Sequence, residues 1–182
     1  MKREAGFTLT ELMTVTAIVA ILLAIGVPSY KNITTSYRMS SEVNNLLGDL
    51  MYARGEAIKE GQYVTVCVSS TGTTCTAGGW QSGWIVFPNP TQAANPAPGT
   101  VLRVQAAFGG TDTFVATSGI NSVTYNREGF AWTAAGGFLA NTVIKLHNAT
   151  ATAGYTRCLA VTAQGMTYTE TVATSISNPA CT

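Results

Sequence analysis

The segment Phe7–Tyr30 constrains this chain more than any other feature. It reads FTLTELMTVTAIVAILLAIGVPSY, and Glu11 is the only formal charge in it. A segment this apolar is typical of a chain that inserts into a bilayer. A charged side chain at the centre of a bilayer costs about 2.5–3.5 kcal/mol on insertion scales. Glu11 is therefore predicted to have a function that compensates for this cost.

The residues on either side of Glu11 favour a membrane-spanning helix. Leu12–Tyr30 is an uncharged run of 19 residues, close to the roughly 20 that a helix needs to cross a hydrocarbon core of about 30 Å. Lys2 and Arg3 precede it, and the positive-inside rule keeps such a short basic end in the cytoplasm. No small-residue cleavage site of the ordinary secretory kind follows the apolar region. Pro28 predicts a kink or break near residues 24–28, because it removes a helical hydrogen bond and clashes with the preceding turn.

A second, amphipathic helical segment is expected to continue to about residue 60, where Gly61 offers a stop signal. Apolar residues recur there at spacings of three, four and seven, with polar residues mainly between them. The polar set includes Glu42, Asp49 and Glu56. The apolar set is Val43, Leu46, Leu47, Leu50, Ala57 and Ile58.

The rest of the chain reads as strands and turns. Seven apolar or alternating runs are separated by segments rich in Gly, Pro, Ser and Thr, and no helical pattern interrupts them. This order favours antiparallel pairing over βαβ units, and Pro88–Gly99 is expected to be a surface loop. The predicted strands lie within Tyr63–Ser69, Gly83–Phe87, Val101–Phe108, Ile120–Tyr125, Thr142–His147, Tyr155–Ala163 and Met166–Val172. We therefore expect an α+β fold, a long kinked N-terminal helix packed on an antiparallel sheet domain.

The four cysteines indicate an oxidising compartment, because an even number follows a membrane-inserting segment. Four cysteines allow three connectivities, and sequence alone does not choose among them. We favour Cys67–Cys75, because the residues around them read as a strand running into a turn. Cys158–Cys181 would then tie the C-terminal tail to a strand.

Composition argues against an enzyme, a metalloprotein or a strong nucleic-acid binder. Charged residues are 10% of the chain, and outside residues 1–6 the two signs balance, so no basic surface is expected to attract phosphates. The sequence has no metal-ligand cluster, no phosphate-binding loop and no His-paired nucleophile motif, and no cofactor or metal is expected. The lone His147 is expected to be a surface or satisfied residue, and Asp112 and Glu128 to be solvated or turn residues. Trp80, Trp84 and Trp132 are expected to pack in the core or on a strand face.

The run Gly6-Phe7-Thr8-Leu9-Thr10-Glu11 resembles the class III signal of type IV pilins and type II secretion pseudopilins. The resemblance implies a leader peptide, residues 1–6, that prepilin peptidase removes between Gly6 and Phe7, followed by N-methylation of Phe7. It also implies that Glu11 pairs with the N-terminal ammonium of a neighbouring subunit during assembly. Pro28 matches the proline that the family carries late in its apolar helix. Thr10 departs from the usual Ile or Val.

A second resemblance covers the middle of the chain. The helix end Met51–Ala57, the strand Val64–Cys67 and the Trp-containing run Gly79–Phe87 look like the FimT/GspH group of minor pilins and pseudopilins. DNA-binding members carry a basic Gly-Arg-x-Arg motif on a C-terminal strand. The matching stretch here, Gly165–Tyr168, contains no arginine, so nucleic acid is a possible partner that we do not favour.

These resemblances imply a minor type IV pilin that is processed and then incorporated into a pilus, or primes one. The alternatives are a type II secretion pseudopilin and a DNA-binding minor pilin for DNA uptake. The expected partners are other pilin subunits, prepilin peptidase and inner-membrane lipid. The expected organisation is a leader at 1–6, a transmembrane and filament-core helix at 7–30, and a globular domain at 31–182. That domain would be periplasmic before assembly and at the cell surface afterwards.

Overall fold

A computed structural model describes residues 6–97, 99–117, 119–133, 136–174 and 181. The chain divides into two compact units, Met1–Arg38 and Met39–Thr182. Each unit is described by itself below.

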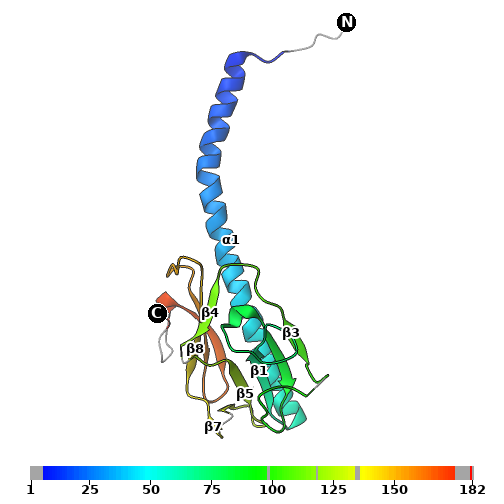
Figure 1. Cartoon of the computed structure of the whole chain (residues 1–182). Coiled ribbons are helices and arrows are strands. Elements are labelled where there is room, and N and C mark those ends of the chain that lie inside the picture. Colours follow the sequence, from blue (N-terminus) through cyan, green and yellow to red (C-terminus); the bar gives the residue numbers. More distant parts are fainter. Residues whose placement is uncertain (1–5, 98, 118, 134–135, 175–180, 182) are drawn as a thin grey trace. The chain divides into compact units, whose positions relative to one another are not determined.

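The first element, α1, is a single helix from Leu9 to Glu60 (Figure 1). Helical structure runs without interruption through Pro28, so the predicted break there is wrong, while the kink stays a prediction. A proline deprives a helix of one hydrogen bond, and the turns on both sides hold a long helix together across that gap. The helix ends where the sequence indicated, because Gly61 adopts a φ of +64° and the next N–H, that of Gln62, donates to the Ala57 carbonyl at 3.2 Å.

In the globular unit, one face of α1 is buried. The buried positions recur every three or four residues, and Leu47 packs partly buried beside them. Two sequence expectations fail here: Ile58 is 52% exposed and Glu42 is buried. Ala57 takes the inward position at the last turn, so Ile58 lies about 100° further round the helix. The buried residues of α1 are Met39, Glu42, Val43, Leu46, Leu50, Ala53 and Ala57.

Ten strands among the described residues form two antiparallel sheets. The six-stranded sheet has the order β3-β2-β1-β5-β6-β7, and the four-stranded sheet has the order β10-β9-β8-β4. The bounds in the first sheet are β1 Val64–Val68, β2 Trp84–Pro88, β3 Arg103–Gln105, β5 Ser122–Tyr125, β6 Ala131–Thr133 and β7 Gly137–Phe138. Those in the second are β4 Thr113–Ala116, β8 Thr142–His147, β9 Arg157–Val161 and β10 Thr167–Thr171. Short 3-10 turns lie at Trp80–Ser82 and Val172–Thr174.

Six of the seven predicted runs contain a whole strand, and the run Gly83–Phe87 contains all of β2 except its last residue, Pro88, which was expected in the loop. The sequence missed β4, β6 and β7. The missed strands have two to four residues, too short for alternation to be recognised. Asp112, expected to be a solvated or turn residue, is 4% exposed and directly precedes β4. The predicted loop after β2 is anchored from within, because the Asn89 side chain donates to Thr65 Oγ1 at 2.9 Å.

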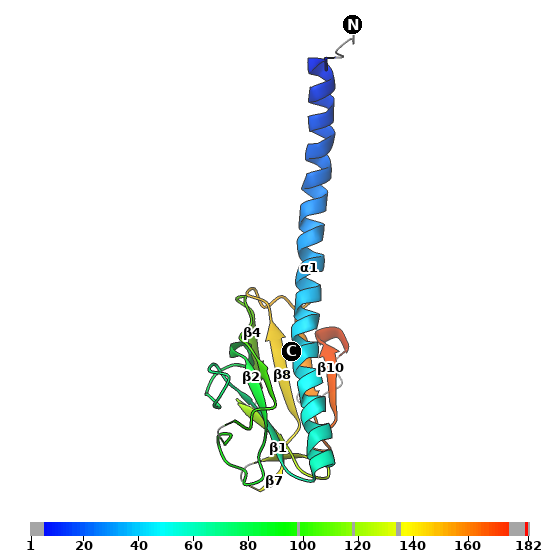
Figure 2. The ribbon, with the colours of Figure 1, turned by 90° about the vertical axis from the view of Figure 1, so that its right-hand side faces the viewer.

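The core of the globular unit lies between α1 and both sheets. One cluster of buried residues joins α1 positions such as Leu46 and Leu50 with Val66 and Trp84 of the first sheet and Leu159 of the second. Figure 2 shows residues 39–60 of α1 running alongside the strands, with β10 next to the helix. The sheets therefore cover the apolar stripe that the sequence left exposed.

All four cysteines form disulfide bonds. Cys67 in β1 bonds Cys75, and Cys158 in β9 bonds Cys181. This is the pairing that the sequence favoured. The first fastens the loop after β1, and the second fastens the C-terminal end of the chain to the four-stranded sheet.

Asp49 joins α1 to the six-stranded sheet. One carboxylate oxygen accepts from Trp84 Nε1 at 2.8 Å, and the other accepts from Arg103 at 2.9 Å. The Arg103 guanidinium also lies over the Tyr52 ring, 3.7 Å from its centroid. The Asp49 side chain is 14% exposed and Trp84 is fully buried, so this contact is shielded from water.

Replacing Asp49 with alanine is expected to destabilise the globular unit by about 2–3 kcal/mol, because it leaves the buried Trp84 N–H without an acceptor. Asp49→Asn, which keeps an acceptor, should cost less, and Arg103→Ala should cost about 1 kcal/mol because that side chain is half-exposed. Urea unfolding of the full chain, followed by tryptophan fluorescence, measures all three. Equal losses for Asp49→Ala and Arg103→Ala would contradict the dominant role of the tryptophan bond.

Candidate functional site

The start of α1 is built around Glu11. Thr8 precedes the helix and caps it, because its Oγ1 accepts from the Glu11 N–H at 3.2 Å. A threonine followed three residues later by glutamate is the capping-box spacing. A carboxylate in the first turn also interacts favourably with the positive end of the helix dipole. The same residue that is costly in an apolar medium thus stabilises the helix end on which it lies.

The threonine hydroxyls around Glu11 all have partners within the segment. Thr8 and Thr10 lie 3.2 Å apart through their hydroxyls. Thr14 donates to the Glu11 carbonyl at 3.0 Å, and Thr16 donates to the Leu12 carbonyl at 3.0 Å. Hydroxyls bonded back to their own helix lose much of the cost of leaving water. Within the described residues, the Glu11 carboxylate has no hydrogen bond and no ion pair.

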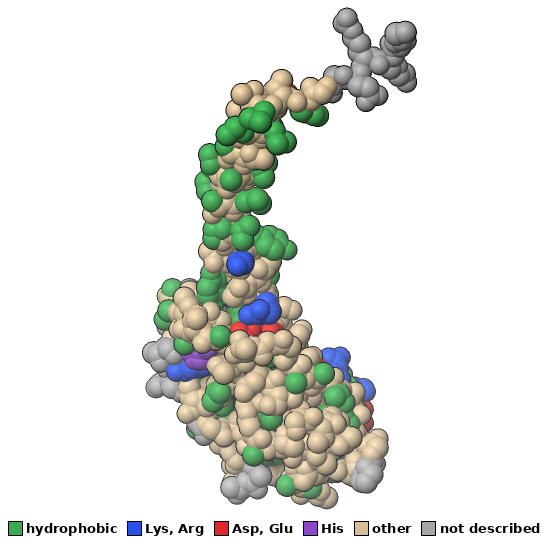
Figure 3. Space-filling view, turned by 45° about the horizontal axis from the view of Figure 1, so that its top comes forward, with side chains coloured by type: hydrophobic (Ala, Val, Ile, Leu, Met, Phe, Trp, Pro, Cys, Tyr) green, Lys and Arg blue, Asp and Glu red, His purple; other side chains and the backbone are tan. Residues whose placement is uncertain are grey.

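The side chains of this segment are exposed from Gly6 to Thr34. Figure 3 shows hydrophobic side chains distributed along the visible face of the helix there. Among the described residues, α1 is the helix that is long and apolar enough to cross a membrane, and its most apolar window has no buried residue. A helix that is apolar on all sides needs lipid or other helices around it. The helix of unit 1 thus needs an apolar environment that the unit itself does not supply.

The other N-terminal residues singled out by the sequence lie on either side of Glu11. Gly6 and Phe7 are exposed and precede the helix, and Pro28 lies inside it. Lys2 and Arg3, and the rest of the leader before Gly6, lie outside the described residues. Gly6 and Phe7 therefore lie in an exposed, non-helical stretch ahead of the helix cap.

In the part of the globular unit that the structure describes, no cluster of side chains suggests catalysis. His147 Nδ1 lies 3.1 Å from the Thr156 hydroxyl, and burial, with Lys145 nearby, lowers the His147 pKa below its usual value. No group of three or more His, Cys, Asp or Glu side chains among the described residues could hold a metal ion. The β10 strand, which begins in the stretch compared with DNA-binding members, contains no Lys or Arg.

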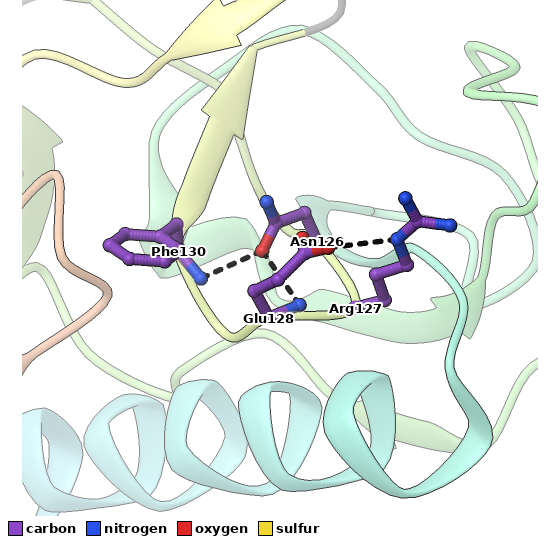
Figure 4. Close-up of polar contacts among 4 residues, drawn as sticks. All are labelled: Asn126, Arg127, Glu128 and Phe130. Atoms are coloured by element: carbon purple, nitrogen blue, oxygen red, sulfur yellow. Dashed lines mark hydrogen bonds and ion pairs between the residues drawn. The ribbon is translucent and has the colours of Figure 1, made fainter.

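The structure reveals a residue that spacing rules missed, Arg54. Its Nε donates to the Gly129 carbonyl at 2.9 Å, and its Nη2 donates to the Gln164 carbonyl at 3.3 Å. Asn126 stabilises the turn at Gly129, because its Oδ1 accepts from the N–H groups of Glu128 and Phe130 at 3.1 and 2.9 Å (Figure 4). Arg54 thus links the turns at Gly129 and Gln164, which are far apart in sequence, to α1. In the sequence, Arg54 could be noticed only as part of the helix-end motif Met51–Ala57, which gives no indication of its hydrogen-bond partners.

Two family models match this chain, one at its N-terminus and one over most of the globular unit. Residues 42–165 match the family described as type II transport protein GspH, and residues 1–27 match the prokaryotic N-terminal methylation motif. The chain is 31% identical over 123 residues to the type IV major fimbrial protein FimA of Dichelobacter nodosus, covering 65% of this chain and 74% of that protein. It is 41% identical over 64 residues to a fimbrial protein of Pseudomonas aeruginosa, covering 35% of this chain and 41% of that protein.

A solved structure shares the fold. The type IV minor pilin FimU of Pseudomonas aeruginosa superimposes with a TM-score of 0.58 at 17% identity, over 76% of this chain and 92% of that one. An N-terminal methylation motif, one long helix and two antiparallel sheets are therefore found together in this chain. The chain belongs to the GspH family of type IV pilin-like proteins, the minor pilins and pseudopilins.

Proposed function

We propose that this protein is a minor pilin that is inserted in the bacterial inner membrane, processed by prepilin peptidase and then incorporated into a type IV pilus. The observation that carries the proposal is the state of Glu11. Its hydroxyl neighbours are satisfied within the helix, while its carboxylate has no partner in the described residues. A charge kept in an apolar segment becomes tolerable when a second molecule supplies the opposite charge.

The amine created by cleavage is a suitable partner. Removal of residues 1–6 would leave Phe7 with an N-terminal ammonium, and N-methylation would keep that positive charge. The ammonium of one subunit and the Glu11 carboxylate of its neighbour then form an ion pair inside the filament. The globular unit would be periplasmic before assembly, and residues 7–30 would leave the lipid to join the filament core.

Processing is tested with the full chain expressed in bacterial membranes, with and without an active prepilin peptidase. Peptidase should shorten the chain by residues 1–6 and add one methyl group to Phe7, both read by intact mass. Gly6→Leu should block the cleavage and leave the globular unit unchanged. An uncleaved wild-type chain beside a peptidase that processes a known substrate would refute the proposal.

A pseudopilin of type II secretion is the second candidate, because the family that matches residues 42–165 is described as a type II transport protein. Deleting the gene from its host separates the two. A pilus role predicts fewer surface pili and weaker twitching with normal processing of the major subunit. A secretion role predicts normal pili and retention of secreted proteins in the periplasm.

A further inference from the structure

Exposed apolar side chains of the globular unit gather around Arg54. Met51 and Ile58 flank it on α1, and Met166 lies across from them at the start of the β10 region. Phe130 and Phe138 stack edge to face nearby, with ring centroids 5.4 Å apart. The exposed fractions of these five side chains run from 37% to 59%. We call this set, Met51, Arg54, Ile58, Phe130, Phe138 and Met166, the Arg54 patch.

The patch is hollowed in two adjoining places. A groove of about 420 Å³ is lined by Met51, Arg54 and Met166, with Tyr168 at its wall. A hollow of about 260 Å³ is lined by Phe130, Phe138 and Gln164. Arg54 connects them, because its guanidinium donates to the Gln164 carbonyl. Surfaces that combine contiguous apolar side chains with a central arginine are typical of protein interfaces.

Arg54 has no carboxylate partner among the described residues, and the neighbouring carboxylates are engaged elsewhere. Asp49 bonds Arg103, and Glu56 bonds Lys59 at 3.2 Å. Glu128, next to Gly129, bonds Arg127 at 2.8 Å (Figure 4). The two bonds that Arg54 makes go to neutral carbonyl oxygens. A guanidinium has five N–H donors, so a half-buried positive charge with spare donors lies at the base of an apolar groove.

We propose that the Arg54 patch binds an amphipathic helix of another subunit, which presents a carboxylate to Arg54 between two apolar side chains. Met51 and Ile58 are seven residues apart, about 10.5 Å along α1, with Arg54 between them. A helix lying alongside matches this spacing with an apolar residue, an acidic residue one turn later and an apolar residue after two turns. The patch is a second assembly contact, separate from Glu11.

Nucleic acid fits this surface less well. Binding to a phosphate backbone requires several cations along a groove, and the patch offers one cation among apolar side chains. Its apolar walls favour a partner that buries hydrophobic area together with a single negative charge.

The test uses the full chain in lipid nanodiscs and a synthetic peptide of about 16 residues, long enough to form a helix. The peptide carries Leu, Glu and Leu at helical positions i, i+4 and i+7 on an Ala/Gln background, and a matched peptide has Lys in place of Glu. We expect the acidic peptide to bind at least about tenfold more tightly than the Lys peptide, as an arginine hot spot would require. Fluorescence anisotropy measures both, with empty nanodiscs as the lipid control.

Met166→Glu is the informative variant, because it places a carboxylate beside Arg54 without disturbing the two carbonyl contacts. Met166 is 55% exposed, so the substitution is compatible with folding. It should weaken binding of the acidic peptide about tenfold or more. Val104→Glu, at a position 58% exposed on β3, introduces the same charge outside the patch and should leave binding unchanged.

Equal binding of the two peptides, or an unchanged affinity in Met166→Glu, would overturn the proposal. So would tighter binding of a duplex DNA probe that Met166→Glu abolishes, which would assign the patch to nucleic acid. The inference rests on the proposed function for the identity of the partner as a subunit. Peptide binding needs neither cleavage nor a filament, so its failure and a failure of processing are separate results.

Discussion

Glu11→Ala is expected to leave membrane insertion and cleavage after Gly6 intact while excluding the protein from filaments. Removing a carboxylate from an apolar helix makes insertion easier, by about 2.5–3.5 kcal/mol on insertion scales. Under the proposed pairing, the same change would leave the ammonium of the neighbouring subunit unpaired in the filament core, and breaking a buried pair costs about 3–5 kcal/mol. That loss corresponds to a fall in incorporation of roughly a hundredfold or more.

The measurement is the amount of the protein in sheared pili relative to the membrane fraction. Thr14→Ala is the matched control, one turn away, where the lost hydroxyl bonded only to its own helix at the Glu11 carbonyl. It should be incorporated like the wild type. Glu11→Asp, which keeps the charge on a shorter side chain, should fall between the two. Efficient incorporation of Glu11→Ala would remove the pairing mechanism and leave membrane anchoring as the function of the segment.

Gly165→Ala is expected to be the most damaging single-methyl change in the globular unit. Gly165 adopts a φ of +76°, and a Cβ there would overlap the Gly129 carbonyl oxygen and lie 3.1 Å from Arg54 Nε. The left-handed conformation alone costs an alanine about 1–2 kcal/mol. The overlap adds to this cost because Arg54 bonds the Gly129 carbonyl and the Gln164 carbonyl next to Gly165, which keeps the two turns from moving apart. We expect a total loss above about 3 kcal/mol, at the upper end of point mutations.

Gly61→Ala is the control that separates the cost of a positive φ from the cost of the steric overlap at Gly165. Gly61 has a φ of +64° with nothing within 4 Å of a Cβ, so alanine there should cost only about 1 kcal/mol. Urea unfolding of both variants, followed by the fluorescence of the buried Trp80 and Trp84, gives the comparison. Similar losses at the two positions would show that the approach of the two turns is unimportant.

The regular parts of the fold could be predicted from local patterns. The seven predicted runs each overlap a strand, and α1 ends just before the glycine that marked its end. The strands β4, β6 and β7 could not be found this way. The four-residue β4 leaves the neighbourhood of β3 and β5 to pair with β8 in the other sheet. Alternation reports that a segment has an inner and an outer face, and it contains no information about which strand it will pair with.

The candidate site divides in the same way. Glu11 could be identified from sequence because its surroundings are local: the apolar residues that make it costly and the threonine that caps it lie within a few residues. Arg54 could not, because its partners at Gly129 and Gln164 are 75 and 110 residues away. Asp49 was placed on the polar side of α1 for the same reason, since nothing near it in sequence reveals Trp84 or Arg103.

The sequence by itself determined the properties of the N-terminal segment. It is apolar, it is long enough to cross a membrane, it has a single charge, and it resembles the pilin signal around Gly6 and Phe7. Hydropathy and helix capping act over a few residues, so they can be read along the chain. Only the tertiary structure decided which polar residues of α1 became buried, which strands joined which sheet, and that Arg54 lies in an apolar groove without a carboxylate partner in the described residues. These outcomes depend on contacts between distant segments, and such contacts form only when the whole core packs.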